Sequence, residues 1–173
     1  MNPSMQRRHG YESLRCGRVS IERATYFVTV CTHERRVGLT DHVCAVGVRT
    51  QLRTIECDHV AEVAAAVIMP DHLHFLFTLT GNLAVGQVVA RLKFKTRLAL
   101  ARFGLRWQGN YFEHRLRPDD PLEDVIRYMF LNPYAAGLLP REQKYLLFWT
   151  SDAVALWFDP TLNESRPFPE WLA

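Results

Sequence analysis

Hydrophobic and polar residues alternate most clearly over residues 72–80, where every second side chain is large and apolar. Neighbouring side chains of a strand point to opposite faces, so Leu73 and Phe75 would enter a core while His72 and His74 would share the other face. Other runs are rich in β-branched and aromatic residues, which favour strands. The pattern predicts strands over residues 24–31, 62–69, 72–80 and 111–117, and the short connection between the second and third indicates an antiparallel hairpin.

Three other segments carry apolar residues at the three- and four-residue spacing of an amphipathic helix. The first would begin at a cap on Thr40 or Asp41 and end near Glu56. Its apolar stripe would consist of Val43, Val46, Leu52 and Ile55. The second would run from about Val85 to Phe103. The third would run from about Pro121 to Asn132, with Asp119 or Asp120 as its cap and Pro133 as its end.

The predicted order of elements is β-α-β-β-α-β followed by one more helix. This is the order of a ferredoxin-like split sheet, an α+β fold in which two helices cover one face of an antiparallel sheet. The last helix would then cover the opposite face, where His72 and His74 are expected. We interpret residues 1–173 as one domain, with a basic arm over residues 1–24 and an aromatic extension over residues 141–173.

Composition narrows the cellular setting. The net charge is +3, and 48% of the residues are hydrophobic, as in an ordinary globular protein. No stretch approaches the roughly 20 apolar residues of a membrane span, and the first residues do not resemble a secretion signal. The scattered cysteines Cys16, Cys31, Cys44 and Cys57 are typical of free thiols in a reduced compartment, so we expect a cytoplasmic protein.

The charge is unevenly distributed. The sequence has no acidic residue between Ala84 and Arg106, which favours a polyanionic partner over a merely solvated helix face. The basic candidates for phosphate contacts are Arg35, Arg36, Lys93, Lys95, Arg97, Arg115 and Arg117. Trp107, Tyr111 and Phe112 would either stack on unpaired bases or pack in the core.

Two pairs of residues suggest chemistry. His72 and His74 would either form half of a metal site or serve as hydrogen-bonded polar residues at a strand end. Tyr128 and Asn132 are four residues apart and so lie on one side of the last helix. Asn132 offers an amide oxygen suited to a hard divalent ion, and Tyr128 offers a phenol that could attack phosphorus, unless it is simply a half-buried aromatic.

These residues lie in three ordered blocks that resemble the HUH single-tyrosine transposases, and most closely the REP-associated tyrosine transposases. The blocks are Pro70-Asp71-His72-Leu73-His74, then residues 107–117 beginning Trp107-Gln108, and then Tyr128 to Leu138 with Asn132-Pro133 inside it. The resemblance covers roughly residues 18–140. Histidine–x–histidine alone is weak evidence, but three blocks with similar gaps are specific.

The resemblance implies a ferredoxin-like fold, His72, His74 and Asn132 as ligands of Mg²⁺ or Mn²⁺, and Tyr128 as nucleophile. It implies single-stranded DNA beside short palindromic hairpins as the substrate, cut and rejoined through a 5′-phosphotyrosine. We expect His114 to position DNA and not to bind the metal. The sequence departs from the family at Ala135, where a basic residue is common, and over residues 150–152.

Other interpretations remain open. The chain could be a domesticated protein that binds hairpins without cutting them, although such a protein needs none of the four residues His72, His74, Tyr128 and Asn132. It could also be a metal-dependent phosphodiesterase that uses activated water. A monomer is favoured by analogy with the family, and a dimer in which Tyr128 serves the partner's histidines is the alternative.

Overall fold

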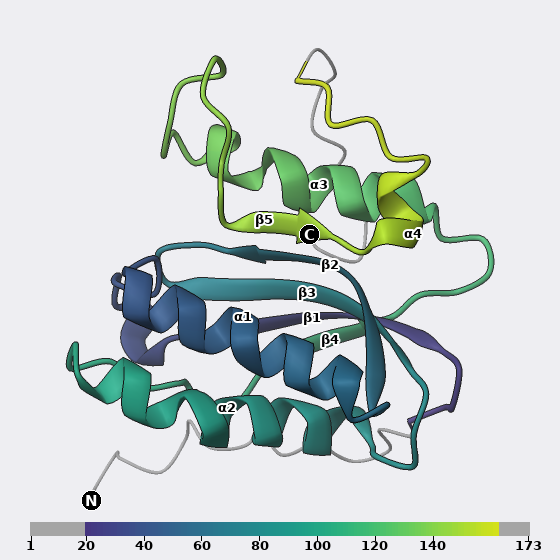
Figure 1. Ribbon diagram of the computed structural model, residues 1–173, viewed down its shortest axis with the longest axis horizontal. Coiled ribbons are helices and arrows are strands. Elements are labelled where there is room, and N and C mark those ends of the chain that lie inside the picture. The colour runs from purple at the N-terminus through teal and green to yellow at the C-terminus, as the bar shows by residue number, and fades with distance from the viewer. Residues whose placement is uncertain (1–19, 163–173) are drawn as a thin grey trace, which may run out of the picture.

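A computed structural model describes residues 20–162, and its centre is a five-stranded antiparallel sheet. The sheet order is β4-β1-β3-β2-β5 (Figure 1). Its strands are β1 (Thr25–Cys31), β2 (Ala61–Ile68), β3 (His72–Leu79), β4 (Phe112–Arg115) and β5 (Phe148–Thr150). The first four strands have the predicted split arrangement, in which β3 lies between β1 and β2.

Helices cover both faces of this sheet. Figure 1 shows α1 (His42–Cys57) and α2 (Val85–Ala101) on one side, and α3 (Leu122–Ala135) with α4 (Asp152–Ala155) on the other. A short 3-10 turn, η1 (His33–Arg35), follows β1. The predicted α+β fold, with a last helix on the face opposite α1 and α2, is confirmed.

The strand register decides which residues enter each core. Phe75 lies opposite Val28 and joins the core beneath α1 and α2, as the alternation predicts. Cys31 lies opposite His72 and Thr29 opposite His74, so these four side chains belong to the other face. There, Phe27, Ala65, Val67 and Leu76 form a second core with α3.

The predicted apolar stripe of α1 is wrong in its first turns. Asp41 caps the helix by accepting the backbone N–H of Val43, as predicted. However, Val43 is 39% exposed and Val46 is 48% exposed. The buried side of α1 instead includes the small residues Cys44 and Ala45. The helix lies close to α2, since a Cβ placed on Gly47 would be only 3.3 Å from the Cβ of Ala99.

The ends of α3 also differ from the prediction. Neither predicted aspartate caps the helix, since the capping position is Pro121 and no side chain bonds there. Pro133 does not end it, because losing one N–H near the last turn removes a single helical bond. The helix ends at Ala135. Just beyond it, Gly137 has a φ of 67°, and the Leu138 N–H donates to the Pro133 carbonyl (3.0 Å), which together form a Schellman motif.

The outer side of α3 is covered by residues that follow it, and residues 125–133 are consequently all buried. Strand β5 was not predicted, and its three residues pair with the free edge of β2. The Phe130 ring packs edge-on against Phe148 at 5.3 Å and against Phe158 at 5.9 Å between centroids. Arg127 donates to Glu123 and to the Asp159 carbonyl.

Two other expectations can be compared with the structure. Within residues 20–162 the three cysteines Cys31, Cys44 and Cys57 are free thiols, and no helix is long and apolar enough to cross a membrane. Cys16, most of the predicted basic arm and the end of the predicted extension, from residue 163 on, lie outside the described residues.

The packing of the extension on α3 can be tested with two nearby residues. We expect Phe158→Ala to lower the free energy of unfolding by about 3 kcal/mol, because it removes a buried ring between α3 and β5. Leu156→Ala is the matched control: its side chain is 89% exposed, and the change should cost less than about 0.5 kcal/mol. Equal losses in urea denaturation would contradict the observed packing.

Candidate functional site

His72 and His74 lie side by side on β3, with ring centroids 4.5 Å apart. Their Nε2 atoms approach to 3.0 Å. Each Nδ1 atom has a different partner: the His72 Nδ1 donates to Asp71 Oδ1 at 2.6 Å, and the His74 Nδ1 lies 2.8 Å from Thr29 Oγ1. With a proton on each Nδ1, both Nε2 lone pairs would face one point, which is the usual arrangement of metal-binding imidazoles.

Arg35 belongs to the surroundings of this pair. Its Nε lies 3.0 Å from Asp71 Oδ2, and its Nη1 donates to the Cys31 sulfur at 2.8 Å. The backbone at Glu34 and Arg35 is left-handed, with φ of 57° and 55°, which is uncommon for residues other than glycine. This turn directs Arg35 back to Asp71. Arg35, which was predicted to contact a phosphate, is therefore paired with the carboxylate beside His72.

Burial keeps His72 in its neutral form. Desolvation lowers the pKa of its imidazole, and the nearby Arg35 charge acts in the same direction, while the Asp71 carboxylate opposes both. The net direction is downward. Since a metal binds the neutral imidazole, the pair is suited to bind an ion near neutral pH.

Tyr128 reaches the same face from α3. Its ring centroid lies 5.8 Å from that of His74 and 6.3 Å from that of Phe27, all in one chain. Asn132 is one turn further along α3, and Tyr128 and Asn132 are only 8% and 7% exposed. The structure therefore brings the phenol to the histidine pair within a single copy of the chain.

The side chains available to a metal can be compared with what an ion needs. Over residues 20–162, no three His, Cys, Asp or Glu side chains gather into a metal-binding group. Asn132, on α3, carries an amide oxygen, a type of donor that hard divalent ions accept. Two imidazoles with one amide oxygen suit Mn²⁺ or Mg²⁺ and leave positions for phosphate oxygens.

His114 is on the same sheet face, because it lies opposite Phe27 across β4 and β1. Its Nε2 atom lies 3.0 Å from Asp120 Oδ2. The same oxygen accepts the Arg117 backbone N–H at 2.8 Å. Both bonds hold the pKa of Asp120 below its ordinary value, and the bond from the Arg117 backbone has the larger effect. His114 thus secures the loop before α3.

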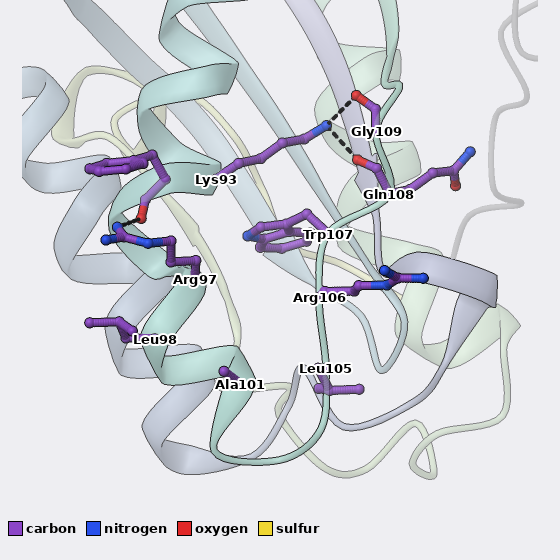
Figure 2. A pocket seen from close by; sticks show the side chains of 10 residues that line it. Lys93, Arg97, Leu98, Ala101, Leu105, Arg106, Trp107, Gln108 and Gly109 are labelled. Carbon is purple, nitrogen blue, oxygen red and sulfur yellow. Dashed lines mark hydrogen bonds between the residues drawn. The ribbon is translucent and has the colours of Figure 1, made fainter.

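The predicted DNA-contacting residues fall into two groups. Lys93 and Trp107 have bonds inside the protein. Lys93 Nζ donates to the carbonyls of Gln108 (2.8 Å) and Gly109 (3.3 Å), which Figure 2 shows, and to that of Asn110 (3.0 Å). The Trp107 indole donates to the Thr96 hydroxyl (2.8 Å). The side chains in the second group are exposed: Arg36, Lys95, Arg97, Arg115 and Arg117.

Two residues of the site were missed from sequence. Asp71 directly precedes His72, so its position in the block was a signal for a role beside the histidine. Thr29 had none, because it is 45 residues from His74 in sequence and meets it only through the β1–β3 register. Phe112, whose role sequence left open, lies opposite Thr29 and is 41% exposed on the histidine face.

The Asp120 bonds give a test of the loop before α3. Because its pKa is lowered in the folded protein, Asp120 stabilises the fold fully above its ordinary pKa of 3.8 and loses that effect as pH falls through the lowered value. We expect Asp120→Asn to lower stability at pH 7 by less than about 1 kcal/mol, since the site is near the surface. The exposed neighbour, in Asp119→Asn, is the control.

Thermal unfolding of both variants between pH 3 and pH 7 is the measurement. The gap between Asp120→Asn and the unchanged protein should shrink as the pH is lowered. A gap that is constant over this range would show that the Asp120 charge does not stabilise the loop.

Comparison with known proteins places this geometry in a family. The family model described as transposase IS200-like matches residues 20–129, which include β1 to β4 and Tyr128. A REP-associated tyrosine transposase of Escherichia coli is 25% identical over 122 residues, covering 69% of this chain and 72% of that one. A protein of Haemophilus influenzae, described as a candidate of the same kind, is 27% identical over 132 residues, covering 65% and 71%.

A solved structure of a REP-associated tyrosine transposase bound to a REP hairpin has the same fold. It superimposes with a TM-score of 0.64 at 23% sequence identity, covering 76% of this chain and 79% of that one. The structural match shows the fold, and the family match covers the segment that carries the histidine pair and Tyr128. This chain belongs to the IS200-like transposase family.

Proposed function

We propose that this protein is a metal-dependent endonuclease and strand transferase for single-stranded DNA, acting next to short palindromic hairpins through a 5′-phosphotyrosine. The observation that carries the proposal is the 5.8 Å separation of the Tyr128 and His74 rings on the face where two Nε2 atoms converge. A phenol beside two imidazoles, with the Asn132 amide one helical turn from the phenol, supplies the groups that this reaction needs.

His72, His74 and Asn132 would hold the ion, Mg²⁺ or Mn²⁺. When bound, the ion polarises the scissile phosphate and offsets the negative charge that grows in the transition state. Asp71 and Thr29 keep the Nδ1 sides of the two rings occupied, which leaves the Nε2 sides as the ligands. Burial keeps the His72 pKa low, so that protons compete little with the ion.

Tyr128 is the nucleophile in this proposal. Its oxygen forms a bond to phosphorus while the bond from phosphorus to the 3′-oxygen breaks. The phenolic proton is lost, and the departing 3′-oxygen gains one and becomes a hydroxyl. The energy of the phosphodiester is retained in the phosphotyrosine, so a 3′-hydroxyl can reverse the step and rejoin strands.

Several observations support DNA hairpins as the partner and a single copy as the active unit. A relative of the same fold was solved with a REP hairpin. The exposed cations Lys95, Arg97, Arg115 and Arg117 offer contacts for phosphates. Tyr128 is near the His74 of its own chain, which favours a monomer over exchange of tyrosines between two copies.

One observation favours the second candidate, a hairpin-binding protein that does not cut. Tyr128 is only 8% exposed, so its oxygen can meet a phosphate only if DNA enters close to α3. Binding through the exposed cations requires no such approach. The two candidates differ in whether a covalent adduct forms.

The tyrosine can be tested by its covalent product. We expect Tyr128→Phe to abolish the protein–DNA adduct on hairpin substrates with Mn²⁺ or Mg²⁺, because the attacking oxygen is gone, and to change DNA affinity less than about threefold. Tyr134→Phe, on the same helix and with its hydroxyl bonded to the Gln143 carbonyl, is the matched control and should retain the adduct.

Denaturing electrophoresis of labelled DNA separates the candidates. Nicking that persists in Tyr128→Phe would refute Tyr128 as nucleophile. Cleavage by the unchanged protein without any protein-linked product would instead indicate a phosphodiesterase that uses activated water. No adduct on any hairpin or metal would favour the binding protein.

The Asp71 contact gives a prediction for the metal. We expect Asp71→Asn to weaken Mn²⁺ binding by about 10- to 100-fold, because the amide no longer holds the His72 Nδ1 proton as strongly. Glu34→Gln, an exposed change in the adjacent turn, should leave affinity unchanged. Titration calorimetry with Mn²⁺ alone measures both, and equal affinities would show that Asp71 does not orient His72.

A further inference from the structure

A groove separates α2 from the chain segment of residues 105–109, on the side of the molecule that Figure 2 shows. Its volume is about 540 Å³. The indole of Trp107 and the side chains of Leu98 and Leu105 give it apolar walls, and Arg97 and Arg106 contribute cations. The groove therefore combines an aromatic surface with positive charge.

The groove has the charge that a nucleic acid requires. Within residues 20–162 no Asp or Glu lines it, and the sequence has none from His72 to Phe112. Phe94 and Leu98 are 59% and 67% exposed, so the groove and its edge offer apolar surface to a ligand. The Arg97 guanidinium lies 3.8 Å from the Phe94 ring centroid, so a flat cation and an aromatic ring are stacked at the groove's edge.

Internal bonds hold the groove open in one shape. Lys93 Nζ donates to three consecutive carbonyls, Gln108 to Asn110, and so fixes one wall to α2; Figure 2 shows the first two of these bonds. The Trp107 indole N–H donates to the buried Thr96 hydroxyl, which sets the direction of the ring. Arg106 Nη2 lies 2.9 Å from His33 Nε2, which positions this guanidinium as well.

The groove lies beside α2, on the opposite face of the sheet from the histidine pair, and contacts past the ends of β1 and β3 connect the two. Thr32 bridges to Trp107 on one side, and its N–H donates to the Asp71 carbonyl at 2.9 Å on the other. Two strand spacings of about 4.8 Å put Trp107 about 10 Å from Asp71. A DNA strand with the 3.4 Å rise of stacked bases covers that distance in about three nucleotides.

We propose that this groove binds an unpaired nucleobase of the DNA strand, with Arg97 and Arg106 on the phosphates that flank it. The inference rests on the proposed function, because it takes the same strand that reaches the histidine pair. Every base has a flat face that can stack on aromatic rings, and phosphates suit the cations. A peptide or a second copy of the chain would contact the apolar walls but would bring no phosphates to the two cations.

The first experiment tests the phosphate contacts. Binding of a hairpin with an unpaired extension is measured by fluorescence anisotropy at several salt concentrations. Arg97→Glu should weaken binding at least tenfold and reduce the salt dependence, because one contact is lost and a repulsion gained. Arg53→Glu, an exposed change on α1 outside the groove, should weaken it less than about threefold. Equal effects would overturn the proposal.

The second experiment identifies the occupant by pairing a protein change with a DNA change. An abasic site is placed at each unpaired position in turn. With the unchanged protein, one position should lose about tenfold in affinity, as expected for loss of a stacked base. In the Phe94→Ala variant, the same abasic site should lower DNA affinity less than about twofold. Because the Phe94 side chain is 59% exposed, its removal should leave the fold intact. Losses that are the same in both proteins at every position would refute the base-binding groove.

A third measurement separates this proposal from its alternatives. If Phe94→Ala changes self-association in sedimentation but not DNA affinity, the groove is an interface between copies and the proposal fails. If the Tyr128 adduct forms and no position shows coupling, the groove proposal alone fails. Coupling without any adduct would retain the groove and overturn the cutting activity.

Discussion

The geometry of the site depends on how the inner nitrogen of each imidazole is held. Asp71 holds His72 and Thr29 holds His74, so that the two outer nitrogens converge at 3.0 Å. The first contact follows from chain neighbourhood, and the second from the register of β1 against β3. A shift of that register by one residue would move Thr29 to the other face and leave His74 without this support.

Helix α3 links the site to the rest of the chain. Its inner side packs on Phe27, Val67 and Leu76, and its outer side packs beneath the residues that follow it, including Phe148 and Phe158. A helix that is enclosed on both sides can hold the Tyr128 ring at a fixed distance from His74. The same enclosure leaves little of Tyr128 exposed. The packing that fixes the position of the ring therefore also restricts the approach of a phosphate to it.

Positive charge in the sequence serves two different purposes in this fold. Lys93 and Arg35 organise backbone and side-chain acceptors, the first by bonding three carbonyls and the second by bonding Asp71. Lys95, Arg115 and Arg117 are exposed, and Arg97 is exposed although its Nη1 also donates to the Phe94 carbonyl. A cation whose N–H groups are bonded to carbonyls shapes the surface that DNA would contact, whereas an exposed cation can contact the phosphate itself.

The sequence by itself determined the four main strands, the two helices on one face, and the two-residue spacing that places His72 beside His74, because alternation and helical periodicity are local properties. Tertiary structure decided the rest. Strand β5 is three residues long and exists because the edge of β2 is available to pair with it. The roles of Thr29, Lys93 and Pro133 likewise depend on partners or on packing that local sequence does not encode. Contacts between residues distant in sequence arise only when the chain has folded, so no local pattern could reveal them.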